Sequence, residues 1–314
     1  MSIAAYIKVI GRGKDGARPL TAEQAHDLMS QVLDGRVSDL EIGAFCMAMR
    51  IKGEEVAELD GFVRATLERC LPMPHAKGGV VVLPSYNGAR KLPNLTPLLA
   101  GQLAKQGVAV LIHGPRQDPT RVTTAQVFDA LGWPQANNSA DVEAAWRAGR
   151  PAYIDTATLC PPLARLLDVR WTIGLRNPGH TVAKLLDPIA ANPQQRTLRV
   201  VNHTHPEYAI SLKAYLQHTK ANALLMRGTE GEPVADPRRQ PRFDVYIDGI
   251  HHEALSRAPL EGVLTELPEL PEGFGASATA RYIESILVGQ QALPASIAAQ
   301  VDCLRMSFAD GTIT

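Results

Sequence analysis

Polar residues that can bind an anion follow a short apolar segment in the first third of the chain. Residues 80–83 are Val-Val-Val-Leu, a run typical of a buried strand, and Gly88 lies in the turn that follows. A helix is predicted to begin directly afterwards, and the N–H groups of such a turn and helix start point toward a negatively charged ligand. The candidate phosphate ligands in this loop are Ser85, Asn87, Gly88, Asn94 and Thr96.

Two further segments carry groups that suit the same chemistry. His113 and Arg116 follow the apolar run 108–112, which predicts the next strand, and Arg170 lies in a later segment that contains Gly174. In an open sheet covered by helices, ligands bind beyond the carboxyl ends of the strands, so we expect these side chains to meet the first loop there. His113 and Arg116 are therefore additional candidate phosphate or donor ligands.

Positive charge accumulates around these segments, although the whole chain has a net charge of +0. Residues 84–121 have a net charge of +4, residues 161–228 of +6, and residues 229–314 of −7. A neutral protein can in this way present a local positive groove to polyphosphate or to a nucleic-acid backbone. The candidate nucleic-acid contacts are Arg90, Lys91, Arg121, Arg176, Lys184 and Lys213.

Each of these interpretations has a structural alternative. The charges can scatter over the folded surface, and Lys184 and Lys213 equally fit solvated helix faces. Tyr86 or Trp171 can stack on a base, but for Trp171 we favour a place in the core or in an interface. For Arg90 and Lys91 we favour contact with phosphate.

The composition restricts the class of protein. The chain has 314 residues, of which 45% are hydrophobic, enough for one large or two modest domains. No run of about 18 apolar residues occurs and residues 1–8 lack a signal-peptide pattern, so we expect neither a membrane span nor export. The four cysteines show no metal-ligand spacing, which indicates reduced thiols in a cytoplasmic protein and no metal site.

The character of the sequence changes near residue 72. Before it, capping boxes at Thr21 and Ser38 predict two helices, and Glu54 and Glu55 lead a third. After it, short apolar runs alternate with helical segments, which predicts an α/β fold with a mainly parallel sheet flanked by helices. We predict a helical subdomain, 1–72, joined by helices from about 162–190, and an α/β domain, 73–314. Strands are expected at residues 80–83, 108–112, 152–154, 198–201, 223–226 and 243–247, and helices near 95–106, 123–131, 162–186, 206–218 and 277–288.

This order of elements and motifs resembles anthranilate phosphoribosyltransferase over about residues 1–305. That enzyme has the glycosyltransferase family 3 fold, shared with pyrimidine nucleoside phosphorylases. Phrases such as Ile10-Gly11-Arg12-Gly13-Lys14 and His205-Pro206-Glu207-Tyr208 are similar to a divergent YbiB-type branch, which is described as DNA-binding. The resemblance implies a homodimer formed through the N-terminal helices, with Phe45, Cys46 and Met49 as candidates for burial between subunits. It also implies that Arg170 matches the arginine that binds the acceptor carboxylate.

The chain departs from the biosynthetic enzyme at two places that its chemistry needs. The family's Gly-Thr-Gly-Gly-Asp loop corresponds here to residues 85–89, Ser-Tyr-Asn-Gly-Ala, where Tyr86 is bulky and only Gly88 lacks Cβ. The family's Asp-Glu metal pair falls at Pro233 and Val234, although Glu230 and Glu232 are near enough in sequence to substitute. Magnesium diphosphate needs carboxylate ligands, so the resemblance implies weak or no transferase activity and no required cofactor.

We therefore predict a homodimer that binds nucleic acid, preferentially single-stranded, without sequence preference and without a membrane partner. The alternative is transfer of phosphoribose from its diphosphate donor to anthranilate or a related aromatic acceptor, and only this alternative requires Mg²⁺. Whether DNA or RNA is preferred is left open. Family members commonly continue beyond the position of residues 309–314, so the resemblance implies a shortened C-terminus.

Overall fold

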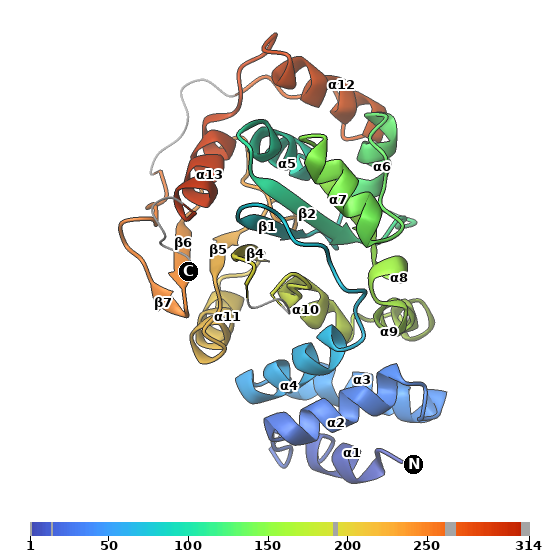
Figure 1. Cartoon of the computed structure of the whole chain (residues 1–314). Coiled ribbons are helices and arrows are strands. Elements are labelled where there is room, and N and C mark those ends of the chain that lie inside the picture. The colour runs from blue at the N-terminus through green and yellow to red at the C-terminus, as the bar shows by residue number, and fades with distance from the viewer. Residues whose placement is uncertain (1, 14, 191–193, 261–267, 309–314) are drawn as a thin grey trace. The chain divides into compact units, whose positions relative to one another are not determined.

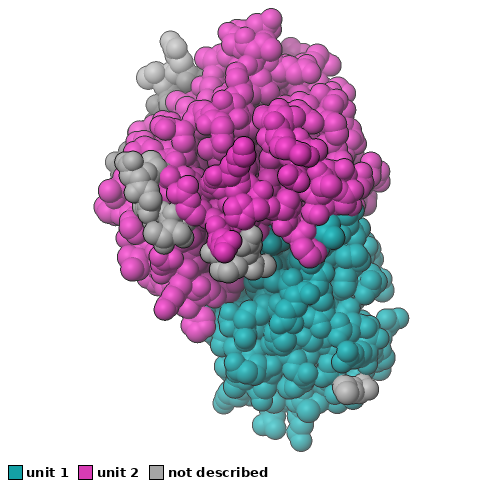
Figure 2. All heavy atoms as spheres, in the orientation of Figure 1, with its two compact units in different colours: residues 1–71, 156–188 teal, residues 72–155, 189–314 magenta. Residues whose placement is uncertain are grey.

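The structure is a computed structural model that describes residues 2–13, 15–190, 194–260 and 268–308. The chain forms two compact units, each built from two stretches of sequence (Figures 1 and 2). Unit 1 comprises Met1–Leu71 and Thr156–Pro188, and unit 2 comprises Pro72–Asp155 and Ile189–Thr314. Residues 309–314, whose length the family resemblance singled out, lie outside the described residues.

Unit 1 is helical throughout its described secondary structure. The predicted capping boxes are present: Thr21 accepts the N–H of Gln24 at 3.2 Å, and Ser38 accepts that of Glu41 at 3.4 Å. Phe45 and Phe62 meet edge to face in its core, with ring centroids 5.8 Å apart. Its helices are α1 (Ala4–Ile10), α2 (Ala22–Leu33), α3 (Asp39–Lys52), α4 (Val56–Leu67), α8 (Thr156–Leu159), α9 (Pro161–Ile173) and α10 (Pro178–Leu185).

The helix expected over 162–186 is two helices. Gly174 adopts the left-handed conformation, with φ of 73°, and so ends α9. Asn177 then caps α10 by accepting the N–H of Gly179 at 3.0 Å, and Pro178 takes the first helical position. The helices expected from about 162–190 are thus present, and Gly174 and Pro178 mark the break between them, which apolar periodicity alone does not locate.

Unit 2 is an α/β structure around a seven-stranded sheet, which confirms the predicted fold class. The strand order is β3-β2-β1-β4-β5-β6-β7; the pairs among β1 to β5 are parallel, whereas β6 and β7 are added antiparallel. All six predicted strands are present within a few residues of the expected bounds. The strands are β1 (Val80–Pro84), β2 (Ala109–Gly114), β3 (Ala152–Asp155), β4 (Thr197–His203), β5 (Ala223–Arg227), β6 (Phe243–Ile247) and β7 (Ile250–His251).

Helices cover both faces of this sheet. In Figure 1, α5, α6, α12 and α13 lie on one side of the sheet, and α11 lies on the other. The strand order reverses between β1 and β4, and a crevice beyond the carboxyl ends of the strands at such a switch point is the usual ligand position in this architecture. The helices of unit 2 are α5 (Thr96–Lys105), α6 (Thr124–Ala130), α7 (Ser139–Arg147), α11 (Glu207–His218), α12 (Ala276–Leu287) and α13 (Ala295–Met306).

Candidate anion and nucleic-acid site

A tight turn after β5 presents two carboxylates to the loop that follows β1. Thr229 and Glu232 pair across the turn, and the two residues between them, Glu230 and Gly231, have φ of 52° and 88°. Positive φ at both central positions is the geometry of a type I′ turn, which favours glycine or asparagine. A glutamate in this conformation is strained, so its side chain must make contacts that compensate.

Glu232 occupies the centre of the loop. Its carboxylate accepts the backbone N–H groups of Asn87 and Gly88, both at 2.7 Å, and its side chain is 2% exposed. The other carboxylate oxygen accepts the hydroxyl of Ser85 and, at 3.3 Å, that of Thr96. Within the described residues Glu232 makes no ion pair, so neutral donors alone hold this buried carboxylate, as they would hold a bound anion.

Glu230 accepts hydrogen bonds from the backbone of the following part of the loop, residues 90–92. Its carboxylate accepts the backbone N–H groups of Arg90, Lys91 and Leu92 at 2.8, 3.0 and 3.1 Å. Burial by itself raises the pKa of Glu230, but these three bonds and the charge of Arg121 outweigh burial and lower the pKa below its ordinary value. The strained backbone of Glu230 is therefore offset by three hydrogen bonds to a charged acceptor.

The remaining predicted phosphate ligands of the loop are joined to one another. The Ser85 hydroxyl is 2.7 Å from that of Thr124, which also accepts the side-chain N–H of Asn94 at 2.9 Å. Asn94 in turn accepts the backbone N–H of Thr96 at 3.2 Å, and all four side chains are buried. The predicted ligands do come together, but their donors already serve internal acceptors.

His113 and Tyr86 form a buried pair. The Tyr86 hydroxyl lies 3.0 Å from Nδ1 of His113, and the two side chains are 5% and 0% exposed. The suggestion that Tyr86 stacks on a base was wrong, because its ring is enclosed by the protein. A histidine at the end of a strand can make an internal contact or bind a ligand, and the sequence does not distinguish these two roles.

Gly88 is required by a contact between two loops. Its φ is 70°, and a Cβ here would lie 2.9 Å from the carbonyl oxygen of Val122. Ala89 and Val122 exchange backbone hydrogen bonds of 2.8 and 2.9 Å, which joins the loop after β1 to the loop after β2. Arg121 donates to the carbonyl of Gly88 at 3.4 Å, which ties this cation to the loop after β1.

The cations around the loop point outward. Arg90, Lys91 and Arg116 are exposed, and Arg121 is half-buried. The predicted contact Lys213 is exposed on α11, which packs on β4 and β5. The Arg116 carbonyl accepts the hydroxyl of Thr123 at 2.9 Å, which fixes the backbone from which that side chain extends. The peptide N–H groups of Arg90 and Lys91 thus face Glu230 while their side chains face solvent.

A second cationic cluster lies within unit 1. The pKa of His180 is lowered to about 3, first by burial and then by the charges of Arg176, Arg170 and Lys184. The Arg170 guanidinium lies over the ring of Trp171, 4.1 Å from its centroid, and Trp171 is 50% exposed. A core position for Trp171 was therefore wrong, and Lys184 is half-buried rather than on a fully solvated face.

The structure gives Glu230 and Glu232 a role that the sequence did not reveal. Their carboxylates are directed at N–H and O–H donors, an arrangement suited to accepting hydrogen bonds rather than to ligating Mg²⁺. Val234, at one of the positions of the family's metal pair, is buried, and no group of three or more His, Cys, Asp or Glu side chains that could hold a metal occurs in the described part of the chain.

Asn202 is another residue that the sequence analysis missed. It lies at the carboxyl end of β4, is 3% exposed, and neither atom of its side-chain amide has a partner among the residues that the structure describes. A Cβ added to Gly228 would lie 3.0 Å from Oδ1 of Asn202, so this amide faces the base of the same turn. A buried amide with free donors and an acceptor can bind a small polar ligand or water. No spacing motif marks it.

Comparison with known proteins agrees with this architecture. A family model described as a glycosyl transferase family helical bundle domain matches residues 5–70. Anthranilate phosphoribosyltransferase of Symbiobacterium thermophilum is 28% identical over 91% of this chain and 82% of its own length. The protein YbiB of Escherichia coli strain K12 is 39% identical over 96% of this chain and 93% of its own length. The chain belongs to the YbiB branch of the anthranilate phosphoribosyltransferase-like family.

Solved structures extend the likeness to the whole fold. The crystal structure of anthranilate phosphoribosyltransferase from Thermus thermophilus matches with a TM-score of 0.75 at 22% identity, covering 98% of this chain and 89% of that one. This YbiB-type chain therefore has the phosphoribosyltransferase fold. None of the helices in its described ranges is long and apolar enough to cross a membrane.

Proposed function

We propose that this YbiB-type protein binds nucleic acid, preferentially single-stranded and without sequence preference, and has little or no anthranilate phosphoribosyltransferase activity. The observation that carries the proposal is the pair of carboxylates that the turn after β5 directs at the loop after β1. Glu230 and Glu232 accept the N–H groups of five successive or nearly successive residues, from Asn87 to Leu92. These are the donors that a diphosphate would need.

Electrostatics argue against diphosphate in this loop. A departing pyrophosphate is stabilised by donors aimed at its developing charge, and each such contact is worth about 10²–10³ in rate. Here the donors are engaged, and a diphosphate would approach two carboxylates at close range. The loop thus lacks the free backbone donors that the transfer reaction requires.

The exposed cations support polyanion binding instead. Arg90, Lys91 and Arg116 extend into solvent from loops whose backbones are fixed by internal hydrogen bonds. Side chains of this kind contact phosphates without reading sequence. In unit 1, the exposed Trp171 carries Arg170 on its face, and a base can stack on such an aromatic ring. Both units therefore offer surfaces suited to single-stranded nucleic acid.

A titration tests this proposal. Labelled single-stranded DNA, double-stranded DNA and single-stranded RNA of equal length are titrated with protein at several salt concentrations, and binding is followed by fluorescence anisotropy. We expect binding to weaken steeply with salt and to favour the single strands, because phosphate contacts release counterions. Binding that is absent at low salt, or that does not respond to salt, would contradict the proposal.

Charge reversal locates the binding surface. The double variant Arg90→Glu and Lys91→Glu should lose binding by at least about tenfold, because two phosphate contacts are removed and repulsion is added. The matched control is Lys77→Glu with Arg147→Glu: both control cations are exposed, and they precede β1 and β3, at the amino ends of the strands. An equal loss in the control would mean that net charge alone is responsible.

We also propose that the protein assembles as a homodimer through α3. The residues first suggested for the interface, Phe45, Cys46 and Met49, are fully buried inside unit 1, so that suggestion was wrong. The exposed apolar residues of α3 are Leu40, Met47 and Ile51, at 84%, 38% and 65% exposure. With Ala44 they recur at helical spacing on one face, which a second copy of the chain can cover.

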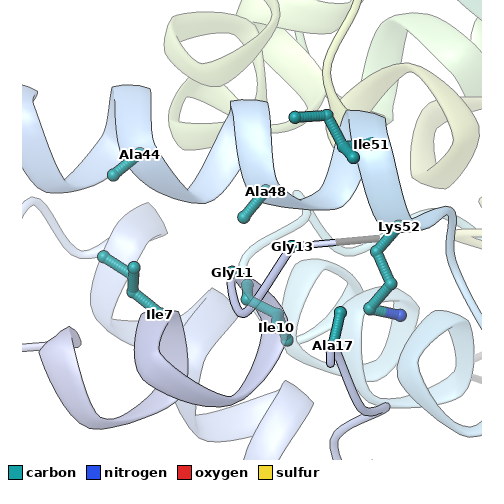
Figure 3. Close-up of a pocket in the computed structure, with 9 residues that line it drawn as sticks. All are labelled: Ile7, Ile10, Gly11, Gly13, Ala17, Ala44, Ala48, Ile51 and Lys52. Atoms are coloured by element: carbon teal, nitrogen blue, oxygen red, sulfur yellow. The ribbon is translucent and has the colours of Figure 1, made fainter. Parts of the chain in front are cut away.

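A hollow beside this stripe also favours this face of α3 as the dimer interface. It has a volume of about 250 Å³ between α1 and α3 and is lined mainly by small and aliphatic residues (Figure 3). Ile51 belongs to both the stripe and the hollow. A dimer would present two copies of the cationic surface and so raise affinity for a long strand through avidity.

The alternative function is phosphoribosyl transfer to anthranilate or a related acceptor. Asn94 and Thr96 still stand at the start of α5, and Arg116 and Arg170 are retained, which favours this alternative. It would require Glu230 and Glu232 to leave the loop and Mg²⁺ to offset their charge. Pyrophosphate release from the phosphoribosyl diphosphate donor with Mg²⁺ and anthranilate, at a rate typical of an enzyme, would establish it and refute the claim of little or no activity.

A further inference from the structure

Two cysteines lie beside the points where the chain passes between the units. The chain leaves unit 1 after Leu71 and returns to it at Thr156. Cys70 directly precedes the first crossing, and Cys160 follows the second by four residues. The two segments are already in contact inside unit 1, because the N–H of Leu71 donates to the carbonyl of Leu159 at 2.7 Å.

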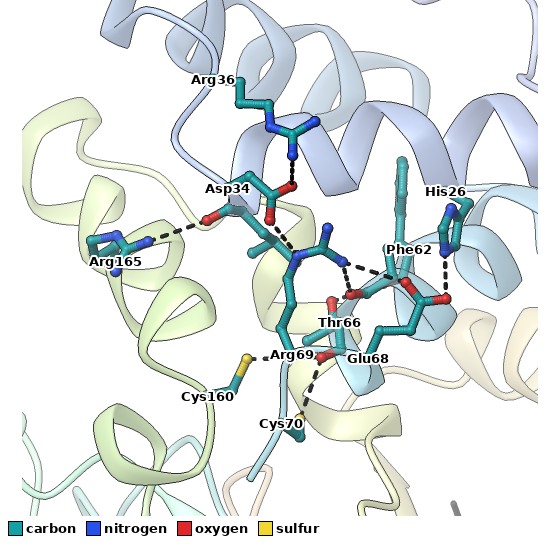
Figure 4. A network of polar contacts seen from close by, with 12 residues as sticks. His26, Asp34, Arg36, Phe62, Thr66, Glu68, Arg69, Cys70, Cys160 and Arg165 are labelled. Atoms are coloured by element: carbon teal, nitrogen blue, oxygen red, sulfur yellow. Dashed lines mark hydrogen bonds and ion pairs between the residues drawn. The ribbon is translucent and has the colours of Figure 1, made fainter.

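The two sulfur atoms converge on a single backbone oxygen. The carbonyl of Thr66, in the last turn of α4, accepts Cys70 Sγ at 3.4 Å and Cys160 Sγ at 3.8 Å (Figure 4). Cys160 is buried, whereas Cys70 is partly exposed.

Two arginines lie near the pair, and one of them, Arg69, forms ion pairs with Asp34 and Glu68. Arg69 donates to Asp34 at 2.7 Å and to the Ala65 carbonyl at 2.6 Å, and Arg165 donates to the Leu33 carbonyl at 3.2 Å (Figure 4). The neighbouring Cys70 thiol lowers the pKa of Cys160, burial opposes this change, and the charges of both arginines lower the pKa further. The Cys160 thiol in turn raises the pKa of Cys70. The pair therefore stabilises one thiolate, the reactive form of cysteine.

The other two cysteines lack these features. Cys46 and Cys303 are buried and widely separated in the chain, with Cys46 in unit 1 and Cys303 in unit 2. Burial raises the pKa of both, that of Cys46 to about 12. A buried neutral thiol is inert toward mild oxidants, so the protein contains an internal control for reactivity.

We propose that Cys70 and Cys160 form a redox-active dithiol that peroxide converts to an intrachain disulfide. One thiolate attacks hydrogen peroxide, an O–O bond breaks, and the products are a sulfenic acid and hydroxide, which takes a proton to become water. The second thiol then attacks the sulfenic sulfur, an S–S bond forms, and a second water leaves. Two thiols lose two electrons in total, and one peroxide is reduced to two waters.

The disulfide would close a covalent ring around both crossing points. Residues 71–159, which include β1, β2 and β3, would lie within that ring. Cross-linking residues so far apart in sequence restricts the unfolded chain and holds the two crossing segments together in the folded one. The oxidation state of the pair would therefore determine how readily the two crossing segments separate from each other.

Mass spectrometry tests the proposal on the full-length protein. Reduced protein is exposed to a small excess of hydrogen peroxide, quenched, denatured and labelled with a maleimide. We expect two labels per chain instead of the four taken up by untreated protein, and a peptide pair that joins Cys70 to Cys160 in a non-reducing digest. The thermal midpoint should rise after oxidation and return with dithiothreitol.

Serine variants supply the controls. Cys70→Ser, at the partly exposed position, should lose both the cross-link and the thermal shift, whereas Cys46→Ser with Cys303→Ser should keep both. Retention of four labels after peroxide, a cross-link between other cysteines or between chains, or a Cys70 sulfinic acid beside an unreacted Cys160 would each overturn the proposal. These readouts do not depend on nucleic-acid binding, so the two proposals succeed or fail separately.

Discussion

The carboxylate of Glu232 accepts the backbone N–H of Gly88 at 2.7 Å, across 144 residues of sequence. The loop after β1 has the strand–turn–helix form of an anion site, and the anion it holds is part of the protein. Because Glu232 is 2% exposed and, among the described residues, is bonded only to neutral donors, its removal leaves several buried polar groups without acceptors.

Glu232→Gln should destabilise the protein by about 2 kcal/mol, since bonds to a charged acceptor are replaced by weaker ones and some donors lose their partner. Unfolding in urea, followed by circular dichroism, measures the change. Glu253→Gln is the control, because Glu253 is 84% exposed in the same unit and should have almost no effect. Equal stability of the Glu232 variant and the wild type would show that the carboxylate is dispensable for folding.

Local signals predicted much of the fold. The capping boxes at Thr21 and Ser38 and the apolar runs of the strands depend on neighbouring residues, so they can be identified from the sequence. The role of Glu232 cannot be identified in this way, because the carboxylate and its donors lie far apart in the chain. The turn that carries Glu232 is also hard to predict from the sequence, because a Glu-Gly pair is a weaker turn signal than Asn-Gly.

The same limit applies to burial in unit 1. Phe45, Cys46 and Met49 form a helical stripe that is apolar enough for either a core or a subunit interface, and only the packing of Phe45 on Phe62 decides between them. For Trp171 we favoured a place in the core or in an interface, and its 50% exposure rules out the core. A hydrophobic pattern identifies a face but not the surface that covers it.

Gly88→Ala should lower the free energy of unfolding more than Gly107→Ala does. Both Gly88 and Gly107 have positive φ, of 70° and 79°, but a Cβ on Gly107 meets no described atom within 4 Å, whereas one on Gly88 lies 2.9 Å from the Val122 carbonyl. We expect a loss of about 1 kcal/mol for Gly107→Ala from conformation alone and about 2–3 kcal/mol for Gly88→Ala. Thermal and urea unfolding of the two variants and the wild type measure these losses. Equal costs would mean that the contact between the loops is not tight.

The stability of unit 1 should depend on pH through His180. The pKa of His180 is about 3 in the folded protein, against 6.5 ordinarily, so below pH 6.5 the unfolded chain binds a proton that the folded one does not. The free energy of unfolding should therefore fall with decreasing pH by about 1.4 kcal/mol per unit between pH 6 and 4. His180→Gln, which keeps a residue suited to the capping box of α10, should lose this contribution.

The measurement is the difference in urea stability between variant and wild type across that pH range. His218→Gln provides the control, because His218 is exposed at the end of α11. A parallel pH dependence for wild type and His180→Gln would show that His180 is protonated as readily in the folded state as in the unfolded chain.

Ile51→Glu should separate the proposed dimer into folded monomers. Ile51 is 65% exposed on α3, where it belongs to the apolar stripe with Leu40 and Met47 and also lines the hollow beside α1. A carboxylate there remains hydrated in a monomer, but a dimer would have to bury two of them without partners, at a cost of several kcal/mol. Sedimentation velocity over a range of concentrations should show dimers for the wild type and monomers for the variant, with unchanged circular dichroism. Val288→Glu, at a 69% exposed position in unit 2, should leave the assembly unchanged. If the wild type is monomeric at all concentrations, or Ile51→Glu stays dimeric, the α3 face is not the interface.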